Sequence, residues 1–96
     1  MNVQVEIKFG STPRKQDFDE MYNASKSLTN NDDSIYIYQR KRPKHVLVAE
    51  FTINKARQID VVDRIGREFS YNLEDYLDSS ISFPKKMSPK KSNTNR

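Results

Sequence analysis

Three segments of the chain alternate apolar and polar residues with a period of two, which is the pattern of a half-buried β-strand. Residues 3–9 place apolar side chains at every second position: Val3, Val5, Ile7 and Phe9. Residues 34–41 and 45–53 repeat the pattern, and the short turn between them predicts a hairpin. A fourth, shorter strand is expected around Ile81 and Phe83, before Pro84.

Two further segments carry apolar residues at helical spacing. The first helix is expected to have Thr12 as its N-cap and Pro13 at its first helical position, and to end before the polar run of residues 29–33. The second is expected over roughly residues 55–77, with Asn54 as its cap. Its predicted apolar stripe is Ile59, Val62, Gly66, Phe69, Leu73 and Tyr76. Within that stripe, the glycine is expected to allow close packing on the sheet.

This order of elements predicts an α+β fold with a ferredoxin-like, split βαβ arrangement, βαββα plus a short final strand. Right-handed crossovers would place both helices on one face of an antiparallel sheet and leave the other face open. A chain of 96 residues makes one domain at most. We expect residues 1–84 to form that domain and residues 85–96 to be a disordered basic tail.

The charge of the chain is unevenly distributed. Residues 1–84 hold 12 Lys and Arg against 13 Asp and Glu, so the net charge of +4 comes from the basic residues after position 84. The chain has no cysteine, which excludes disulfides and thiolate metal sites. No run of about 20 apolar residues predicts a membrane span. The N-terminal residues lack the apolar core of a signal peptide, so we expect a cytoplasmic protein.

No residue pattern predicts an enzyme, a metal site or a cofactor. His45 is the only histidine, and without a nearby orienting acid it is interpreted as an ordinary strand residue. With only two glycines there is no glycine-rich phosphate loop. The strand and helix order is similar to that of the CRISPR adaptation nuclease family, which uses an aspartate at the end of its first strand. That place here reads Lys8-Phe9-Gly10.

The order of elements also resembles that of the RNA-recognition-motif family. The third-strand octamer of that family aligns with residues 44–51, where Lys44 and Phe51 fit. The positions of its two base-stacking aromatics are occupied by Val46 and Val48. The resemblance therefore covers the order of elements and not the stacking platform.

Two basic segments predict contacts with phosphates. The first is the hairpin turn, with Arg40, Lys41, Arg42 and Lys44, and the strand before it carries Tyr36 and Tyr38 on the same face as Arg40. The second is the tail, with Lys85, Lys86, Lys90 and Lys91. Its residues 88–91 resemble the Ser-Pro-Lys-Lys unit of histone tails, which is associated with the minor groove of DNA.

The sequence thus favours a small non-enzymatic regulatory or accessory protein that binds nucleic acid through the basic hairpin tip and the lysine-rich tail. The alternative is a protein-interaction module, either a homodimer or an adaptor or inhibitor. It would use the open sheet face, where Tyr36, Tyr38, Val46 and Val48 are expected to be exposed. This alternative stays open because residues 1–84 are not basic overall.

Overall fold

The computed structural model describes residues 1–54, 61–71, 73 and 76–86. Its elements follow one another as β1 (Asn2–Phe9), α1 (Lys15–Leu28), a turn of 3₁₀ helix η1 (Asp32–Ser34), β2 (Tyr36–Gln39), β3 (Val46–Thr52), α2 (Val61–Tyr71) and β4 (Tyr76–Ser82). The α+β class predicted from the sequence is confirmed. Among the described residues, no helix combines the length and the apolar character needed to cross a membrane.

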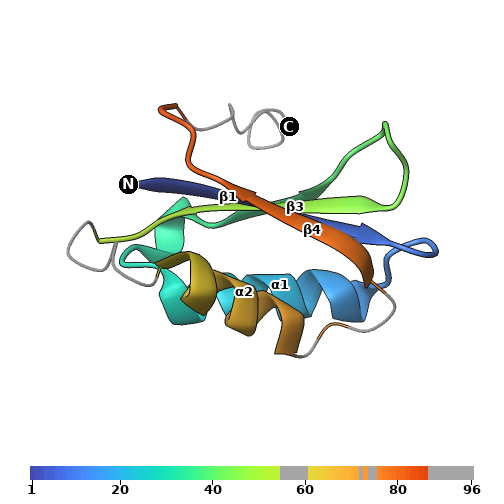
Figure 1. The fold of residues 1–96 in the computed structure, drawn as a ribbon, viewed down its shortest axis with the longest axis horizontal. Helices are drawn as coiled ribbons and strands as arrows, with labels where there is room; N and C mark the ends of the chain where they lie inside the picture. The colour runs from blue at the N-terminus through green and yellow to red at the C-terminus, as the bar shows by residue number, and fades with distance from the viewer. Residues whose placement is uncertain (55–60, 72, 74–75, 87–96) are drawn as a thin grey trace.

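The four strands form one sheet in the order β2-β3-β1-β4, and all three neighbouring pairs are antiparallel. Both helices pack on the same side of this sheet (Figure 1). The opposite side is called the distal face below. Because β1 and β3 are central, their backbone groups are paired on both edges, whereas β2 and β4 are the outer strands.

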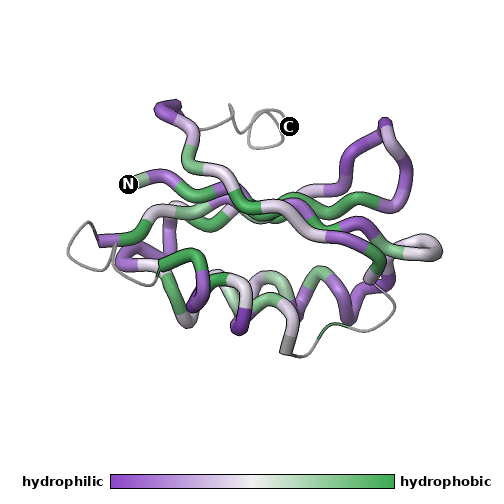
Figure 2. The backbone as a smooth tube through the Cα atoms, in the orientation of Figure 1, coloured by the Kyte–Doolittle hydropathy of each residue, from purple (hydrophilic) through white to green (hydrophobic). Residues whose placement is uncertain are grey.

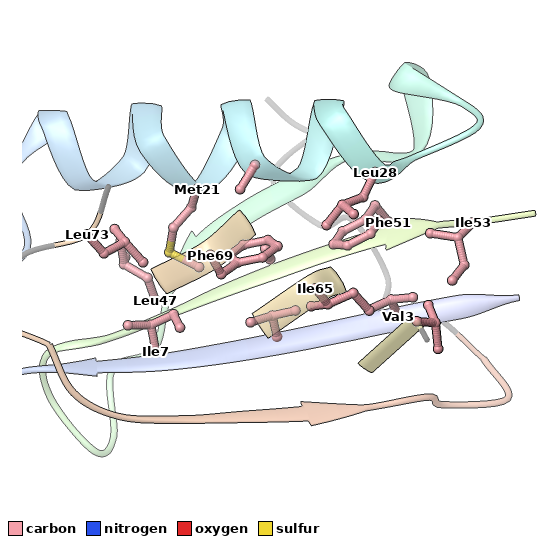
Figure 3. Close-up of a cluster of buried hydrophobic side chains, with 14 of the residues drawn as sticks. Val3, Ile7, Met21, Leu28, Leu47, Phe51, Ile53, Ile65, Phe69 and Leu73 are labelled. Atoms are coloured by element: carbon pink, nitrogen blue, oxygen red, sulfur yellow. The ribbon is translucent and has the colours of Figure 1, made fainter. Parts of the chain in front are cut away.

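The hydrophobic core lies between the sheet and the two helices (Figure 3). Apolar residues of β1 and β3 enter it at alternate positions, as the period of two predicts. Phe51 of β3 stacks on Phe69 of α2 with ring centroids 6.0 Å apart and an interplanar angle of 12°. Phe69 is 2% exposed, which confirms its place in the predicted apolar stripe.

Helix α1 begins at Lys15, so the prediction of Thr12 as the cap and Pro13 as the first helical residue was wrong. The N-cap is Arg14, whose backbone N–H donates a 2.8 Å hydrogen bond to Oδ2 of Asp17. The buried Asp17 carboxylate therefore satisfies a backbone donor at the helix start, in the manner of a capping box. Thr12 and Pro13 stay in the turn between β1 and α1, where Thr12 lies 3.5 Å from His45 at the base of the β2–β3 hairpin.

The second helix ends earlier than predicted, at Tyr71. Phe69 and Leu73 of the predicted stripe are buried as expected, although Leu73 follows the helix. In its first turns the buried residues are Val61 and Ile65, whereas Val62 is 52% exposed. Tyr76 and Leu77, predicted as helical, belong to β4, which is seven residues long. The expected start of the helix, including Ile59, lies outside the described residues. Pairing with β1 explains the difference, because strand hydrogen bonds with β1 override a local helical pattern.

Gly66 does not have the packing role predicted for it. A Cβ built on this residue meets no atom within 4 Å. The residue lines a shallow recess between α2 and β4 together with Ser70 and Ser79. The helix therefore does not need a glycine here in order to approach the sheet.

Candidate nucleic-acid interface

The distal face consists of cross-strand rows of mostly polar side chains. One row contains Tyr36, Glu50, Gln4 and Ser82, and the next contains Tyr38, Val48, Glu6 and Ser80. Cross-strand neighbours of this kind have Cβ atoms about 5 Å apart, close enough for their side chains to interact. The hydrogen bonds that Glu50 accepts from Gln4 and Tyr38 confirm that side chains in these rows interact.

Glu50 lies at the centre of these contacts, and its exposed fraction is 0%. Its Oε2 accepts a 2.9 Å hydrogen bond from Nε2 of Gln4 and a 3.0 Å hydrogen bond from the hydroxyl of Tyr38. A buried carboxylate without such donors would be costly. The hydrogen bond therefore positions the Tyr38 side chain over β3.

The ion pair between Arg40 and Glu6 crosses β3 on the same face. Its two atoms, a guanidinium nitrogen of Arg40 and Oε2 of Glu6, are 2.6 Å apart. Because β3 lies between the strands that carry these residues, the ion pair passes over the part of β3 that contains Val46 and Val48. Arg40 was predicted to bind phosphate, but in the structure its charge is matched by that of Glu6.

The expected patch of exposed valines and tyrosines is only half present. Val46 is 5% exposed and Val48 is 0% exposed, so neither is available to a partner at the distal face. Tyr36 and Tyr38 are half-buried, and their ring centroids lie 4.9 Å apart with the planes tilted by 34°. The two tyrosines are therefore the aromatic surface that remains on this face.

The tip of the β2–β3 hairpin carries exposed positive charge. Lys41, Arg42 and Lys44 are all exposed, and none of them forms an ion pair with a residue that the structure describes. The backbone N–H of Arg40 donates a 2.9 Å hydrogen bond to the carbonyl of Val46, which closes the hairpin below the tip. The three cations thus project from a closed turn, as the sequence predicted.

The lysines after β4 lie near the beginning of β1. The Asn2 side-chain amide donates hydrogen bonds to the carbonyls of Pro84 and Lys85, at 3.2 and 3.0 Å. These contacts fix the first residues of the predicted tail against β1, where Lys85 and Lys86 are exposed. Lys90 and Lys91 lie outside the described residues.

The two basic segments lie at opposite ends of the sheet. The hairpin tip adjoins the end of β1, because the N–H of Phe9 donates to the carbonyl of His45, whereas Lys85 adjoins its start. Strand β1, about 23 Å long, lies between them. Both segments rise from the sheet on the side away from the helices (Figure 1), and both are hydrophilic (Figure 2). They therefore flank the distal face and its two tyrosines.

Two basic residues at the start of α1 are already engaged by acids on the same helix. Arg14 is 3.5 Å from Asp17, and Nζ of Lys15 is 2.8 Å from Oδ2 of Asp19. The hydrogen bond from Lys15 to Asp19, together with the charge of that carboxylate, raises the pKa of the lysine. This end of the helix therefore adds little uncompensated charge to the candidate interface.

His45 is not the ordinary strand residue that the sequence analysis assumed. It precedes β3 and has a φ of 67°, in the left-handed region that few residues other than glycine adopt. Its carbonyl accepts the hydrogen bond from Phe9, and its Nε2 lies 3.5 Å from Oγ1 of Thr12. The single histidine next to a run of basic residues was the available signal, but only the fold brings Thr12 to it.

Hollows lie on both sides of the hairpin. One of about 500 Å³ is lined by Thr12, Gln39, Arg40, Lys41, Lys44 and His45, and no carboxylate is among them. A smaller one of about 150 Å³ is lined by Glu6, Lys8, Pro43, Val46, Asp78, Ser79 and Ser80. The smaller hollow contains acids of the distal face, whereas the larger one offers only cationic, neutral amide and hydroxyl groups, together with the imidazole.

In the part of the chain that the structure describes, no three His, Cys, Asp or Glu residues gather as metal ligands would. Comparison of the chain with protein-family models, with curated proteins and with solved structures finds no match. The function is therefore argued from the arrangement of the side chains alone.

Proposed function

We propose that the protein is a small regulatory or accessory factor that binds nucleic acid across the distal face of a ferredoxin-like, split βαβ sheet. Lys41, Arg42 and Lys44 would contact phosphates at one end of the face, and Lys85 and Lys86 would do so at the other. Tyr36 and Tyr38 would stack on unpaired bases between the two ends. No step of this function is enzymatic.

The observation that carries the proposal is the placement of the two basic segments on the same side of the sheet. Figure 1 shows both rising beyond the distal face. Strand β1, which lies between them, is about 23 Å long, a length that about seven phosphates span along one strand of B-form DNA. One nucleic-acid segment can therefore contact both segments while it passes over the tyrosines.

The acids of the distal face do not oppose this reading strongly. Glu6 is paired with Arg40, and Glu50 is buried and hydrogen-bonded. Asp78, beside the hairpin, is a cross-strand neighbour of Lys8. The exposed cations at the two ends form no ion pair with a described residue. A polyanion would thus meet positive charge at both ends, and between them one ion-paired and one buried carboxylate.

The deciding experiment is an anisotropy titration of the full chain with labelled single-stranded and duplex oligonucleotides. The double variants Arg42→Gln with Lys44→Gln, and Lys85→Gln with Lys86→Gln, should each weaken binding. Lys26→Gln is the matched control, because it removes an exposed charge from the last turn of α1, on the opposite side of the sheet. Binding weaker than about 100 μM at physiological salt would be no stronger than non-specific attraction and would refute the proposal.

A second candidate function is self-association through β4. This outer strand has no partner on its free edge among the described residues, and its Leu77 is 67% exposed. Exposed edge strands are templates for pairing with another chain, and a two-fold axis would let two copies pair through the same edge. Sedimentation of the wild type and of Leu77→Lys tests this, since a concentrated wild type that stays monomeric excludes it.

A further inference from the structure

The hollow between the hairpin and the β1–α1 turn has the chemistry of an anion site. It is formed where three separate segments meet, namely the turn before α1, the end of β2 and the residue before β3. It is an open hollow at the surface, with Thr12, Lys41 and Lys44 exposed. Because it is lined by cationic, amide and hydroxyl groups together with an imidazole, it offers hydrogen-bond donors to an anion from several directions.

The charge in this hollow matches a dianion. Arg40 is neutralised by Glu6, so the lysine charges of Lys41 and Lys44 remain. A phosphate monoester carries between one and a half and two negative charges near neutral pH, with three acceptor oxygens. A phosphodiester within a strand carries one charge and continues on both sides. The charge of a terminal phosphate monoester therefore matches the two lysines of the hollow better than that of an internal phosphodiester.

Thr12 and His45 supply the directional donors. The separation of 3.5 Å between Oγ1 and Nε2 is at the outer limit for a hydrogen bond, so each group can turn to another acceptor. The left-handed backbone at His45 holds its ring at the junction of the hairpin and β1. Such an arrangement places a hydroxyl and an imidazole beside the two lysines.

We infer that this hollow binds the terminal phosphate of a nucleic-acid strand, which rests on the proposed function and goes beyond it. Arg40 lines the hollow and also pairs with Glu6 on the distal face. Gln39 and Tyr38 are consecutive strand residues whose side chains point to opposite faces, so a strand with its terminal phosphate in the hollow would pass Arg40 to reach the tyrosines. Because Arg40 joins the hollow to the proposed interface, a nucleic-acid end is favoured over a phosphorylated peptide as the source of the phosphate.

The test compares oligonucleotides of one sequence with an internal label, carrying a 5′-phosphate, a 3′-phosphate or no terminal phosphate. We expect the full chain to bind one phosphorylated form about tenfold more tightly, which equals about 1.4 kcal/mol. Thr12→Val, Lys44→Gln and His45→Asn should each reduce this preference. Asparagine is chosen because it tolerates the left-handed backbone of position 45.

The control is the double variant Lys85→Gln with Lys86→Gln, at the other end of the sheet. It should weaken binding of all forms equally and leave the preference unchanged. Equal affinity of the wild type for all three forms would overturn the inference and leave the proposed function standing. Absence of binding to every form would overturn both, and a stronger response to a phosphoserine peptide would overturn the nucleic-acid source.

Discussion

The hydroxyl of Tyr38 donates a 3.0 Å hydrogen bond to the carboxylate of Glu50, a residue with no exposed surface. This hydrogen bond links a tyrosine that is proposed to stack on bases to the buried acid of the distal face. It means that Tyr38 has a structural role as well as a proposed binding role. Tyr36 and Tyr38 should therefore respond differently to substitution.

Tyr38→Phe should lower the free energy of unfolding by about 1–3 kcal/mol, because it removes one donor from a buried carboxylate. Urea denaturation followed by circular dichroism measures this. The matched control is Tyr22→Phe, at a tyrosine of α1 that is 41% exposed, where a change within about 0.5 kcal/mol is expected. An equal effect at both positions would show that the Glu50 contact contributes nothing.

Tyr36→Ala should weaken binding of single-stranded oligonucleotides by about 1–3 kcal/mol and leave duplex binding nearly unchanged, because only unpaired bases can stack on an aromatic ring. Tyr36 is preferred to Tyr38 for this test, since Tyr38 also donates to Glu50. The measurement is a pair of anisotropy titrations at one salt concentration, with Tyr22→Ala as the control. Equal losses for both substrates would contradict stacking.

Phe69→Ala should cost about 3–5 kcal/mol, since Phe69 is 2% exposed and stacks on Phe51 across the core. A loss of this size could unfold a domain of fewer than 100 residues. Val62→Ala, on the exposed side of the same helix, should change stability by less than about 0.5 kcal/mol. Thermal denaturation of the two variants compares them, and similar midpoints would mean that the helix packs through another face.

Gly66→Ala should stabilise the protein by about 0.5–1 kcal/mol, because glycine in a helix interior is entropically unfavourable and the space for a Cβ is open. A glycine needed for close packing, as the sequence pattern predicted, would instead make this substitution destabilising. Chemical denaturation of the variant measures the change. Destabilisation would indicate that the glycine is needed for contact with a neighbouring element after all.

The salt dependence of binding should reflect charges at both ends of the sheet. Three exposed cations at the hairpin tip and the five basic residues after position 84 are available. If half to all of them contact duplex DNA, the slope of log affinity against log salt should be roughly −4 to −7. Removing residues 87–96 should flatten the slope by up to about three, because Lys90, Lys91 and Arg96 are lost. An unchanged slope would show that these residues do not contact phosphates.

The local pattern was sufficient to predict most strands and the alternation of core residues within them. Val3, Val5, Ile7 and Phe9 face the core because a period of two is a property of the strand itself. The exposed charges of the hairpin tip were also predictable, since a basic turn has no apolar residue to bury. These features depend on neighbours in the sequence, and the sequence therefore determined them.

Other features depend on which segments meet, and only the tertiary structure decided them. Tyr76 continues a helical pattern but joins β4, because Phe9 of β1 offers it a strand partner that the sequence does not reveal. Val48 is buried on the distal face, where its cross-strand neighbour Glu6 pairs with Arg40, 34 residues away in the chain. Thr12 reaches His45 through the pairing of β1 with β3. Contacts between distant segments follow from strand order and register, and a local pattern does not specify either.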